Sequence, residues 1–384
     1  MFSTTRRRSA RGQRRGTALA ASFLLFLVPA CSSVGTGGGS AGETDTAAVA
    51  AAEERLAPLV VPVEETRIEV DAPLTSRPPA GKRVDVIRYN NSAAALYDQP
   101  MKEAGAALSW DVNIAAVDAT DPQSIPNAMI RAVSQNADYI VVTSSDLQAA
   151  GVGMEAAKKA GIPVFFGAGV GEPQGEVNGL YGNTQSESLR DAIFGLTDKM
   201  IIESGGNGSA LLVNAPDFPQ LAPLGDQTKE YVAEHCSGCS LDVLNIPASD
   251  LGGDVASSIV AKVRQNPTIK YVIISFATLS IGLAPALQAA GLDDVTVYLS
   301  GAEAAEVELI RNGTYAAGSL YPINNYPWLL FDQIARFSVG MDTLQKEHAA
   351  LGMQIWTTES VPDGATSWDP PNYQEQYKKL WQVS

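Results

Sequence analysis

The chain of 384 residues is poor in the side chains on which most catalytic and metal sites depend, because it has only three cysteines and two histidines. Neither His235 nor His348 has an evident nucleophile partner in the sequence. The motifs of serine hydrolases, zinc peptidases and nucleotide-binding enzymes are missing as well. We therefore expect no enzyme activity, no cofactor and no metal ion. Catalytic groups can converge from distant parts of a chain, so an exported hydrolase stays an alternative.

Basic side chains are scarce after residue 30. Six of the 27 basic residues lie in residues 1–30, which leaves 21 bases against 42 acids and a net charge of −21 for the rest. Nucleic-acid binding needs a basic footprint, so we expect no nucleic-acid partner. Binding to an anionic lipid surface would likewise need a covalent anchor.

Residues 1–30 predict an export signal. They combine six arginines, no acid and an apolar run over 17–30, which is short of the roughly 20 residues that span a bilayer. Cys31 directly follows Ala30, and this junction resembles a lipobox that would make Cys31 the lipid-modified first residue of the mature protein. Pro29 departs from the usual lipobox pattern. An ordinary secretory signal and an uncleaved anchor are the alternatives.

Residues 31–81 predict a leash ahead of the folded body. Residues 32–46 are rich in glycine, serine and threonine and too polar to fold. Residues 47–56 fit a short helix. The following stretch holds five prolines, which favour an extended strap lying on the body.

The stretch from Trp110 to Gly169 predicts the fold class. Short runs rich in β-branched and aromatic residues at 112–117, 139–143 and 164–166 are typical of buried parallel strands. An apolar stripe with helical spacing starts at Ile125, and Asp121 followed by Pro122 fits an N-cap and first helical position. A second helix from about Leu147 should end at Gly161. Strand, helix and strand at this spacing indicate a doubly wound α/β sheet.

An internal repeat indicates two such lobes. Residues 136–166 and 268–299 both have the order strand, polar break, helix ending in Ala-Gly, strand. The roughly 300 residues that follow Lys82 are long for one core. In the second lobe we expect strands at 210–214, 241–246, 271–275 and 295–299, and helices at 186–203, 224–234, 255–264 and 281–290.

Ligands of doubly wound sheets bind outside the carboxyl ends of the strands. In the first lobe those loops hold Asp118, Ser144, Ser145 and Asp146, and the glycine-rich run 167–171. Hydroxyls, carboxylates and bare backbone suit a small polar ligand. The alternative for Asp146 is that it only caps the following helix.

Cys236 and Cys239 most simply form a disulfide that closes a small loop in an exported protein. A zinc site would need two more ligands, and only His235 is near. A redox-active pair is the other alternative.

Several aromatic and charged residues have structural explanations. Tyr373, Tyr377, Leu380 and Trp381 have the spacing of one packed helix face. Asp332 and Arg336 resemble a helix surface pair. Tyr326 and Trp328 fit a pocket or a core equally well.

Together these features resemble the ribose/galactose-type substrate-binding proteins of ABC importers. The resemblance rests on the export signal, the two lobes, and the segments DATDPQSIPNAMIRAVSQNADYIVVTSSD and KKAGIPVFFGAG. The HCSGC element and the WDPPNYQEQYKKLW tail resemble actinobacterial lipoprotein members. The family implies a Venus-flytrap fold (periplasmic binding protein type I) with three hinge crossings. The first lobe would comprise 82–183 plus about 322–350, and the second 184–321 plus about 351–384.

The resemblance also implies a set of ligand-binding residues between the lobes. The acid after the strand YIVVT is Asp146, and Glu303 stands where the family usually has an aspartate. Phe276 is the main departure, since sugar binders usually carry an Asn-Asp pair where this chain has Phe276-Ala277. The full expected set is Tyr89, Asn90, Asn91, Ser144, Asp146, Asn214, Phe218, Phe276, Glu303 and Asn325.

The resemblance implies a monomeric, extracytoplasmic lipoprotein that delivers a small ligand to an ABC permease. A sugar or sugar-like polyol is the expected ligand. A less polar or aromatic molecule is the rival, because Phe276 leaves ligand hydroxyls without partners. Presentation of the ligand to a membrane sensor kinase is the alternative role. A repressor is disfavoured, because the chain has an export signal and no basic DNA-binding head.

Overall fold

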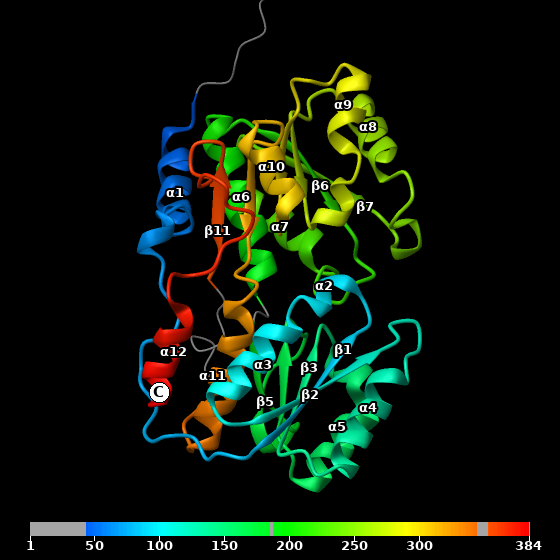
Figure 1. Cartoon of the computed structure of the whole chain (residues 1–384). Helices are drawn as coiled ribbons and strands as arrows, with labels where there is room; N and C mark the ends of the chain where they lie inside the picture. The colour runs from blue at the N-terminus through cyan, green and yellow to red at the C-terminus, as the bar shows by residue number, and fades with distance from the viewer. Residues whose placement is uncertain (1–43, 185–186, 344–351, 384) are drawn as a thin grey trace, which may run out of the picture. The chain divides into compact units, whose positions relative to one another are not determined.

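The computed structural model describes residues 44–184, 187–343 and 352–383, and these form two α/β lobes (Figure 1). The first lobe is built on a five-stranded sheet with the order β2-β1-β3-β4-β5, in which every pair is parallel. Its strands are β1 (Arg83–Tyr89), β2 (Asp111–Val117), β3 (Tyr139–Thr143), β4 (Val164–Gly167) and β5 (Leu180–Thr184).

Helices cover both faces of this sheet. Side chains of α4 (Ser124–Ser134) and α5 (Leu147–Ala160) share one core with the sheet. Those of α3 (Asp98–Ala107) and α11 (Asn325–Ser338) share the other. The central strands β3 and β4 are apolar and buried along their length because helices cover both of their faces.

The second lobe has a six-stranded sheet with the order β11-β10-β9-β8-β6-β7, in which only the pair β10–β11 is antiparallel. The run β7-β6-β8-β9-β10 repeats the order of the first sheet, as the internal repeat predicts. The fold class is therefore confirmed. The strands are β6 (Ser209–Asn214), β7 (Ser240–Asn245), β8 (Tyr271–Ile274), β9 (Thr296–Leu299), β10 (Ala317–Leu320) and β11 (Gln354–Thr357). The helices are α6 (Ser188–Glu203), α7 (Leu224–His235), α8 (Val255–Gln265), α9 (Leu283–Ala290) and α10 (Ala304–Arg311).

The ends of α5 follow the predicted signals, whereas the start of α4 does not. Asp146 caps α5, and Gly161 ends it in the left-handed conformation at φ 69°. Asp121 is not the N-cap of α4, which begins only at Ser124. Its carboxylate instead accepts the N–H of Gln123 at 2.9 Å, so the aspartate forms a tight turn ahead of the helix.

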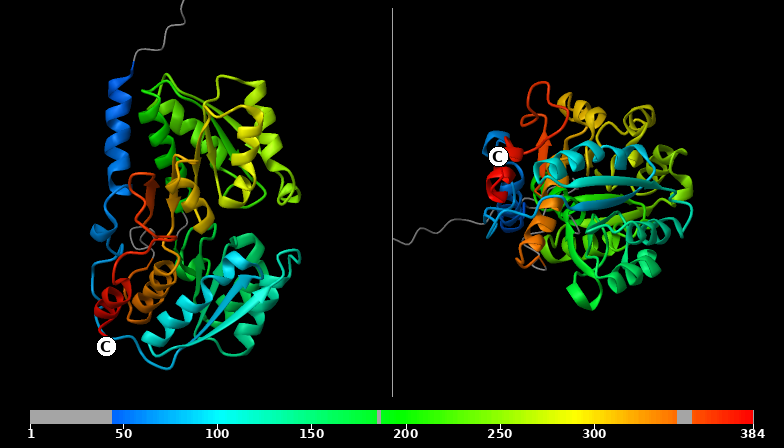
Figure 2. Two further views of the ribbon diagram at one scale, coloured as in Figure 1. Left: turned by 45° about the horizontal axis from the view of Figure 1, so that its top comes forward. Right: turned by 60° about the horizontal axis from the view of Figure 1, so that its bottom comes forward.

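Helix α1 and the strap that follows it join both lobes. α1 (Thr46–Leu56) lies along α6 of the second lobe (Figure 2), where Arg55 forms an ion pair with Asp198 at 2.6 Å. The chain then makes 3₁₀ turns at Ala57–Leu59 and Val63–Glu65. Beyond them Ile68, Val70 and Leu74 enter the core of the first lobe. The strap is therefore an integral part of the fold.

The C-terminal helix α12 (Tyr373–Trp381) belongs to the first lobe, not to the second as its place in the sequence suggests. Trp381 stacks on Trp328 of α11 with ring centroids 5.2 Å apart, and Tyr377 lies in the same core. Trp328 is thus a packing residue. The chain crosses between the lobes after β5, after β10 and between α11 and β11. The strap and the tail add two more crossings to the three that the resemblance implies.

Asp332 and Arg336 form a buried pair, so the prediction of a surface pair is wrong. Both side chains are 0% exposed, and their Oδ2 and Nε atoms lie 2.6 Å apart. Trp381 donates to Asp332, and Arg336 donates to the carbonyl of Ala72 in the strap. Every residue of α11 from Asn325 to Arg336 is buried, so this part of the helix has no exposed face on which the pair could lie.

The predicted signal segment, Cys31 and His348 lie outside the described residues. Among the helices that the structure describes, none is long and apolar enough to cross a bilayer.

Candidate ligand-binding site

Two of the predicted loops lie together at the carboxyl edge of the first sheet. Tyr89 ends β1, and Ser144 and Asp146 follow β3, which pairs directly with β1. Burial, and then the nearby charge of Asp146, raise the pKa of Tyr89. Asn90 and Asn91 are exposed next to Tyr89.

Asp146 and Asn91 also form hydrogen bonds within their own loops. Asp146 accepts the N–H of Ala149 at 2.7 Å, so it caps α5 as the structural alternative proposes. Asn91 accepts the N–H of Ala94 at 2.8 Å and so caps α2 (Ser92–Ala95). Capping does not exclude contact with a ligand, because a carboxylate has further acceptor sites.

The loop around Ser144 is fixed by its neighbours. Ser144 adopts a left-handed conformation at φ 55°, and its N–H donates to the carbonyl of Gly167 at 2.8 Å. Asn183 donates to the carbonyls of Gly169 and Gly171. A site built on loops held in this way is arranged before the ligand arrives.

The carboxyl edge of the second sheet carries four predicted residues. Asn214 ends β6, Phe218 follows it, Phe276 follows β8 and Glu303 follows β9. The rings of Phe218 and Phe276 meet edge to face with centroids 6.0 Å apart. Asn214 is buried, and its Nδ2 donates to the carbonyl of Leu221, whereas its Oδ1 has no partner among the described residues.

Tyrosine side chains lie close together near the second crossing, between β10 and α11. Burial and then the charge of Glu303 in the second lobe raise the pKa of Tyr97 in the first lobe to about 12. Tyr97 also meets the ring of Tyr326 edge to face, with centroids 5.0 Å apart. The hydroxyl of Tyr321 lies 3.1 Å from that of Ser300 at the end of β9. Tyrosines from the first lobe and the crossing therefore gather beside Glu303.

Asn325 is not at either strand edge. It is fully buried, and its Nδ2 donates to the carboxylate of Glu69 in the strap. Its backbone N–H donates to Asp369 in the tail. The side chain joins the strap to the crossing, and its role in binding stays a prediction.

The expected set of ligand-binding residues does not include Tyr97, Tyr321 or Ser275. Tyr97 is the N-cap residue of α3, beyond the short helix α2, and Tyr321 follows β10. Ser275 directly follows β8, and its hydroxyl is fully buried without a partner in the described part of the chain. A search directly past each strand end would have found Tyr321.

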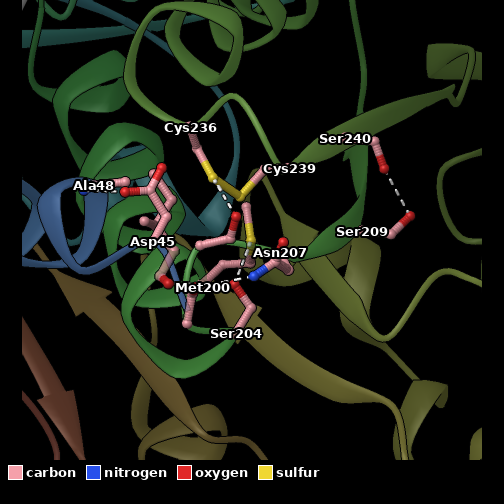
Figure 3. Close-up of a disulfide and its surroundings, with 12 residues drawn as sticks. Asp45, Ala48, Met200, Ser204, Asn207, Ser209, Cys236, Cys239 and Ser240 are labelled. Carbon is pink, nitrogen blue, oxygen red and sulfur yellow. Dashed lines mark hydrogen bonds between the residues drawn. A yellow bond between two sulfur atoms is a disulfide. The ribbon is translucent and has the colours of Figure 1, made fainter. Parts of the chain in front are cut away.

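The disulfide lies away from these edges. The structure joins Cys236 and Cys239 in the turn just before β7, at the amino end of that strand. Figure 3 shows it near Asp45 and Ala48 at the start of α1. The Sγ of Cys236 lies 3.2 Å from the carbonyl oxygen of Gly206. No cluster of potential metal ligands occurs within residues 44–184, 187–343 and 352–383.

Residues 86–340 match the family described as the periplasmic binding protein domain. The chain belongs to this family. None of the curated protein sequences compared with it matches.

Solved structures from distant relatives share the fold of this periplasmic binding protein. A periplasmic ribose ABC transporter protein from Conexibacter woesei is 17% identical, with a TM-score of 0.59 over 74% of this chain and 95% of the other. A 5-methylthioribose transporter solute-binding protein from Thermotoga lettingae is 16% identical, with a TM-score of 0.61 over 80% and 95%. A LacI-type transcriptional regulator from Bacteroides fragilis is 12% identical, with a TM-score of 0.59 over 73% and 98%.

Proposed function

We propose that the protein is the extracytoplasmic solute-binding component of an ABC importer and that it closes its two lobes on a small ligand. The observation that carries this proposal is the family match over residues 86–340, together with two similar α/β lobes whose sheets share one strand order. Hinge closure on a ligand is a known motion of such lobes. It requires that the ligand bind the closed form more tightly than the open one.

A sugar or sugar-like polyol is the ligand class that the first lobe supports best. Tyr89, Asn90, Ser144 and Asp146 offer hydroxyl, amide and carboxylate groups on one edge, which suits a ligand with several hydroxyls. The names of the structural relatives include ribose and 5-methylthioribose transport. A less polar or aromatic ligand is the second candidate, and the Phe218–Phe276 pair favours it.

The remaining parts of the proposal concern partners. We expect the ligand to pass to an ABC permease, and we expect a monomer held at the outer face of the membrane by a lipid on Cys31. The same fold could present its ligand to a sensor kinase. A permease gene beside its own favours import, and a kinase gene without a permease favours sensing. Turnover of the bound molecule would favour a hydrolase instead.

A thermal-shift screen over pentoses, hexoses, polyols and small aromatics tests the proposal. A ligand at 100 times its dissociation constant adds about 2.7 kcal/mol to the free energy of unfolding. We expect Asp146→Ser to abolish the shift from the best ligand while keeping the cap of α5, because serine is also a good N-cap.

Asp45→Ser is the matched control, because Asp45 caps α1 through the N–H of Ala48, beside the disulfide that precedes β7 at its amino end. It should leave the ligand-induced shift intact. If the ligand shifts the melting temperature equally in the native protein and in Asp146→Ser, Asp146 is not part of the site. If no compound in the screen shifts the melting temperature, the proposed ligand classes are wrong.

A further inference from the structure

The start of α1 packs on a turn of the second lobe, residues 205–208, which joins α6 to β6 (Figure 3). Gly205 and Gly206 have positive φ angles of 62° and 79° in this turn. The N–H of Asp45 donates to the carbonyl of Gly205 at 2.9 Å. A Cβ atom at Gly206 would lie 2.8 Å from the Cβ atom of Asp45, so glycine is the residue that leaves room for α1. The position of the first turn of α1 therefore depends on the conformation of this turn.

The loop closed by the disulfide packs against the same turn. The Sγ of Cys236 lies 3.2 Å from the carbonyl oxygen of Gly206. A Cβ atom at Gly238 would collide with that same oxygen, so the loop lies directly on the turn. Gly205 accepts from α1 and its neighbour Gly206 contacts the disulfide. Adjacent peptide groups of one turn thus connect the disulfide to the start of α1.

The disulfide is the main constraint on its own loop. Among the described residues, one backbone hydrogen bond also closes the loop, from the N–H of Cys239 to the carbonyl of Cys236 at 3.1 Å. Cys236 is buried at 2% exposure, whereas Cys239 is half-buried and Ser237 and Gly238 are exposed. Thiol–disulfide exchange needs access to one of the two sulfurs. Cys239 is the sulfur that a reductant reaches more easily.

We propose that the Cys236–Cys239 disulfide is a redox-sensitive switch that holds the turn 205–208 in the conformation on which the start of α1 packs. A dithiol reductant attacks the Sγ of Cys239 through its thiolate, the S–S bond breaks, and the electron pair leaves on the Sγ of Cys236, which takes up a proton. The second thiol of the reductant then displaces Cys239 and passes its proton to it. The reductant becomes a disulfide and the chain carries two thiols. The loop can then move away from Gly206, and the first turn of α1 loses its packing surface.

The far end of α1 is held by contacts that do not involve this turn. Arg55 forms an ion pair with Asp198 at 2.6 Å and donates to the hydroxyl of Tyr231 at 2.8 Å. Ala52 and Leu56 are buried against the second lobe. Reduction should therefore release the first turn of α1 and leave the rest of the helix in place.

Hydrogen exchange of the full chain followed by mass spectrometry, with and without the dithiol dithiothreitol, tests the inference. In the oxidised form the N–H of Asp45 donates to Gly205, and those of Ala48 and Val49 donate to Asp45. We expect residues 44–50 to exchange about tenfold faster after reduction, because the bond that closes so short a loop stabilises the folded state only modestly. Residues 51–57 should exchange at the same rate in both forms.

Two variants separate the switch from general loosening of α1. Cys236→Ser/Cys239→Ser should exchange at residues 44–50 like the reduced chain, with and without dithiothreitol. Arg55→Ala is the matched control, because it should speed exchange at residues 51–57 in both redox forms and leave the response of residues 44–50 to reduction in place.

Three results would overturn the inference. The first is equal exchange of residues 44–50 in the oxidised and reduced native chain. The second is an equal increase across the whole second lobe, which would make the disulfide a general stabiliser. The third is a disulfide that dithiothreitol leaves intact in the folded protein. None of these results depends on the ligand, so the proposed function would stand in each case.

Discussion

Asp332→Asn is expected to lower the free energy of unfolding by about 3–5 kcal/mol. The substitution removes a charge and leaves the guanidinium of Arg336 unpaired in the core of the first lobe. Breaking one side of a buried ion pair costs this much because the remaining charge has lost both water and its partner. Both side chains are 0% exposed, so water cannot replace the lost carboxylate.

The contacts of the pair support the upper part of that range. Asp332 accepts from Arg336 Nε at 2.6 Å and from Trp381 Nε1 at 2.8 Å. Each hydrogen bond to a charged group contributes about 1.5–3 kcal/mol. Asparagine can keep one acceptor for Trp381 but supplies no charge to Arg336. The substitution should therefore destabilise the first lobe through Arg336 and leave the contact between α12 and α11 in place.

Denaturant unfolding followed by circular dichroism measures the effect. Asp226→Asn is the control, because Asp226 pairs with Lys229 at 3.8 Å on the surface of α7 and should cost less than about 0.5 kcal/mol. The double variant Asp332→Leu/Arg336→Met removes both charges and should recover most of the stability. A loss of unfolding free energy below about 1 kcal/mol in Asp332→Asn would refute the reasoning. A double variant whose loss equals the sum of the losses from the two single substitutions would refute it as well.

Two further predictions concern the loop before β7 and the strap. Replacing Cys236 and Cys239 by serine should cost about 2 kcal/mol or less, because the closed loop is short, and should leave ligand affinity unchanged in titration calorimetry. A large loss of ligand affinity would contradict the conclusion that the disulfide lies far from the ligand-binding edges of the sheets. Burial raises the pKa of Glu69 in the folded chain above its usual value of 4.5. The protonated side chain therefore stabilises the fold below pH 4.5, and this stabilisation is lost as the pH rises through the raised pKa. Glu69→Gln cannot titrate, so its unfolding free energy should fall less between pH 4.5 and 7 than that of the native chain, and parallel pH profiles would contradict this account.

The sheets of the two lobes were predictable because both are buried on two faces. Continuous apolar runs such as Tyr139–Thr143 alternate with helical stripes, and that pattern leaves few folds open. The repeat of one βαβ unit also predicted a second lobe similar to the first. The general rule for doubly wound sheets then puts the candidate site at the carboxyl ends of the strands without knowledge of any side-chain position.

Contacts between distant segments were not predictable. The stripe of Tyr377 and Trp381 shows that α12 is packed but not which lobe it packs on. The i, i+4 spacing of Asp332 and Arg336 is the same on a surface and in a core. Only the apolar residues on every side of α11 distinguish the two cases. The contact of Asn325 with Glu69 was hidden for the same reason, because the two residues are 256 apart in the sequence.

Small-angle X-ray scattering of the protein, with and without the tightest ligand from the screen, tests the central claim most directly. Closure of two lobes on the ligand predicts a smaller radius of gyration at saturation, and Asp146→Ser should keep the larger value at the same ligand concentration. An unchanged radius of gyration in the native protein at saturating ligand would contradict the account.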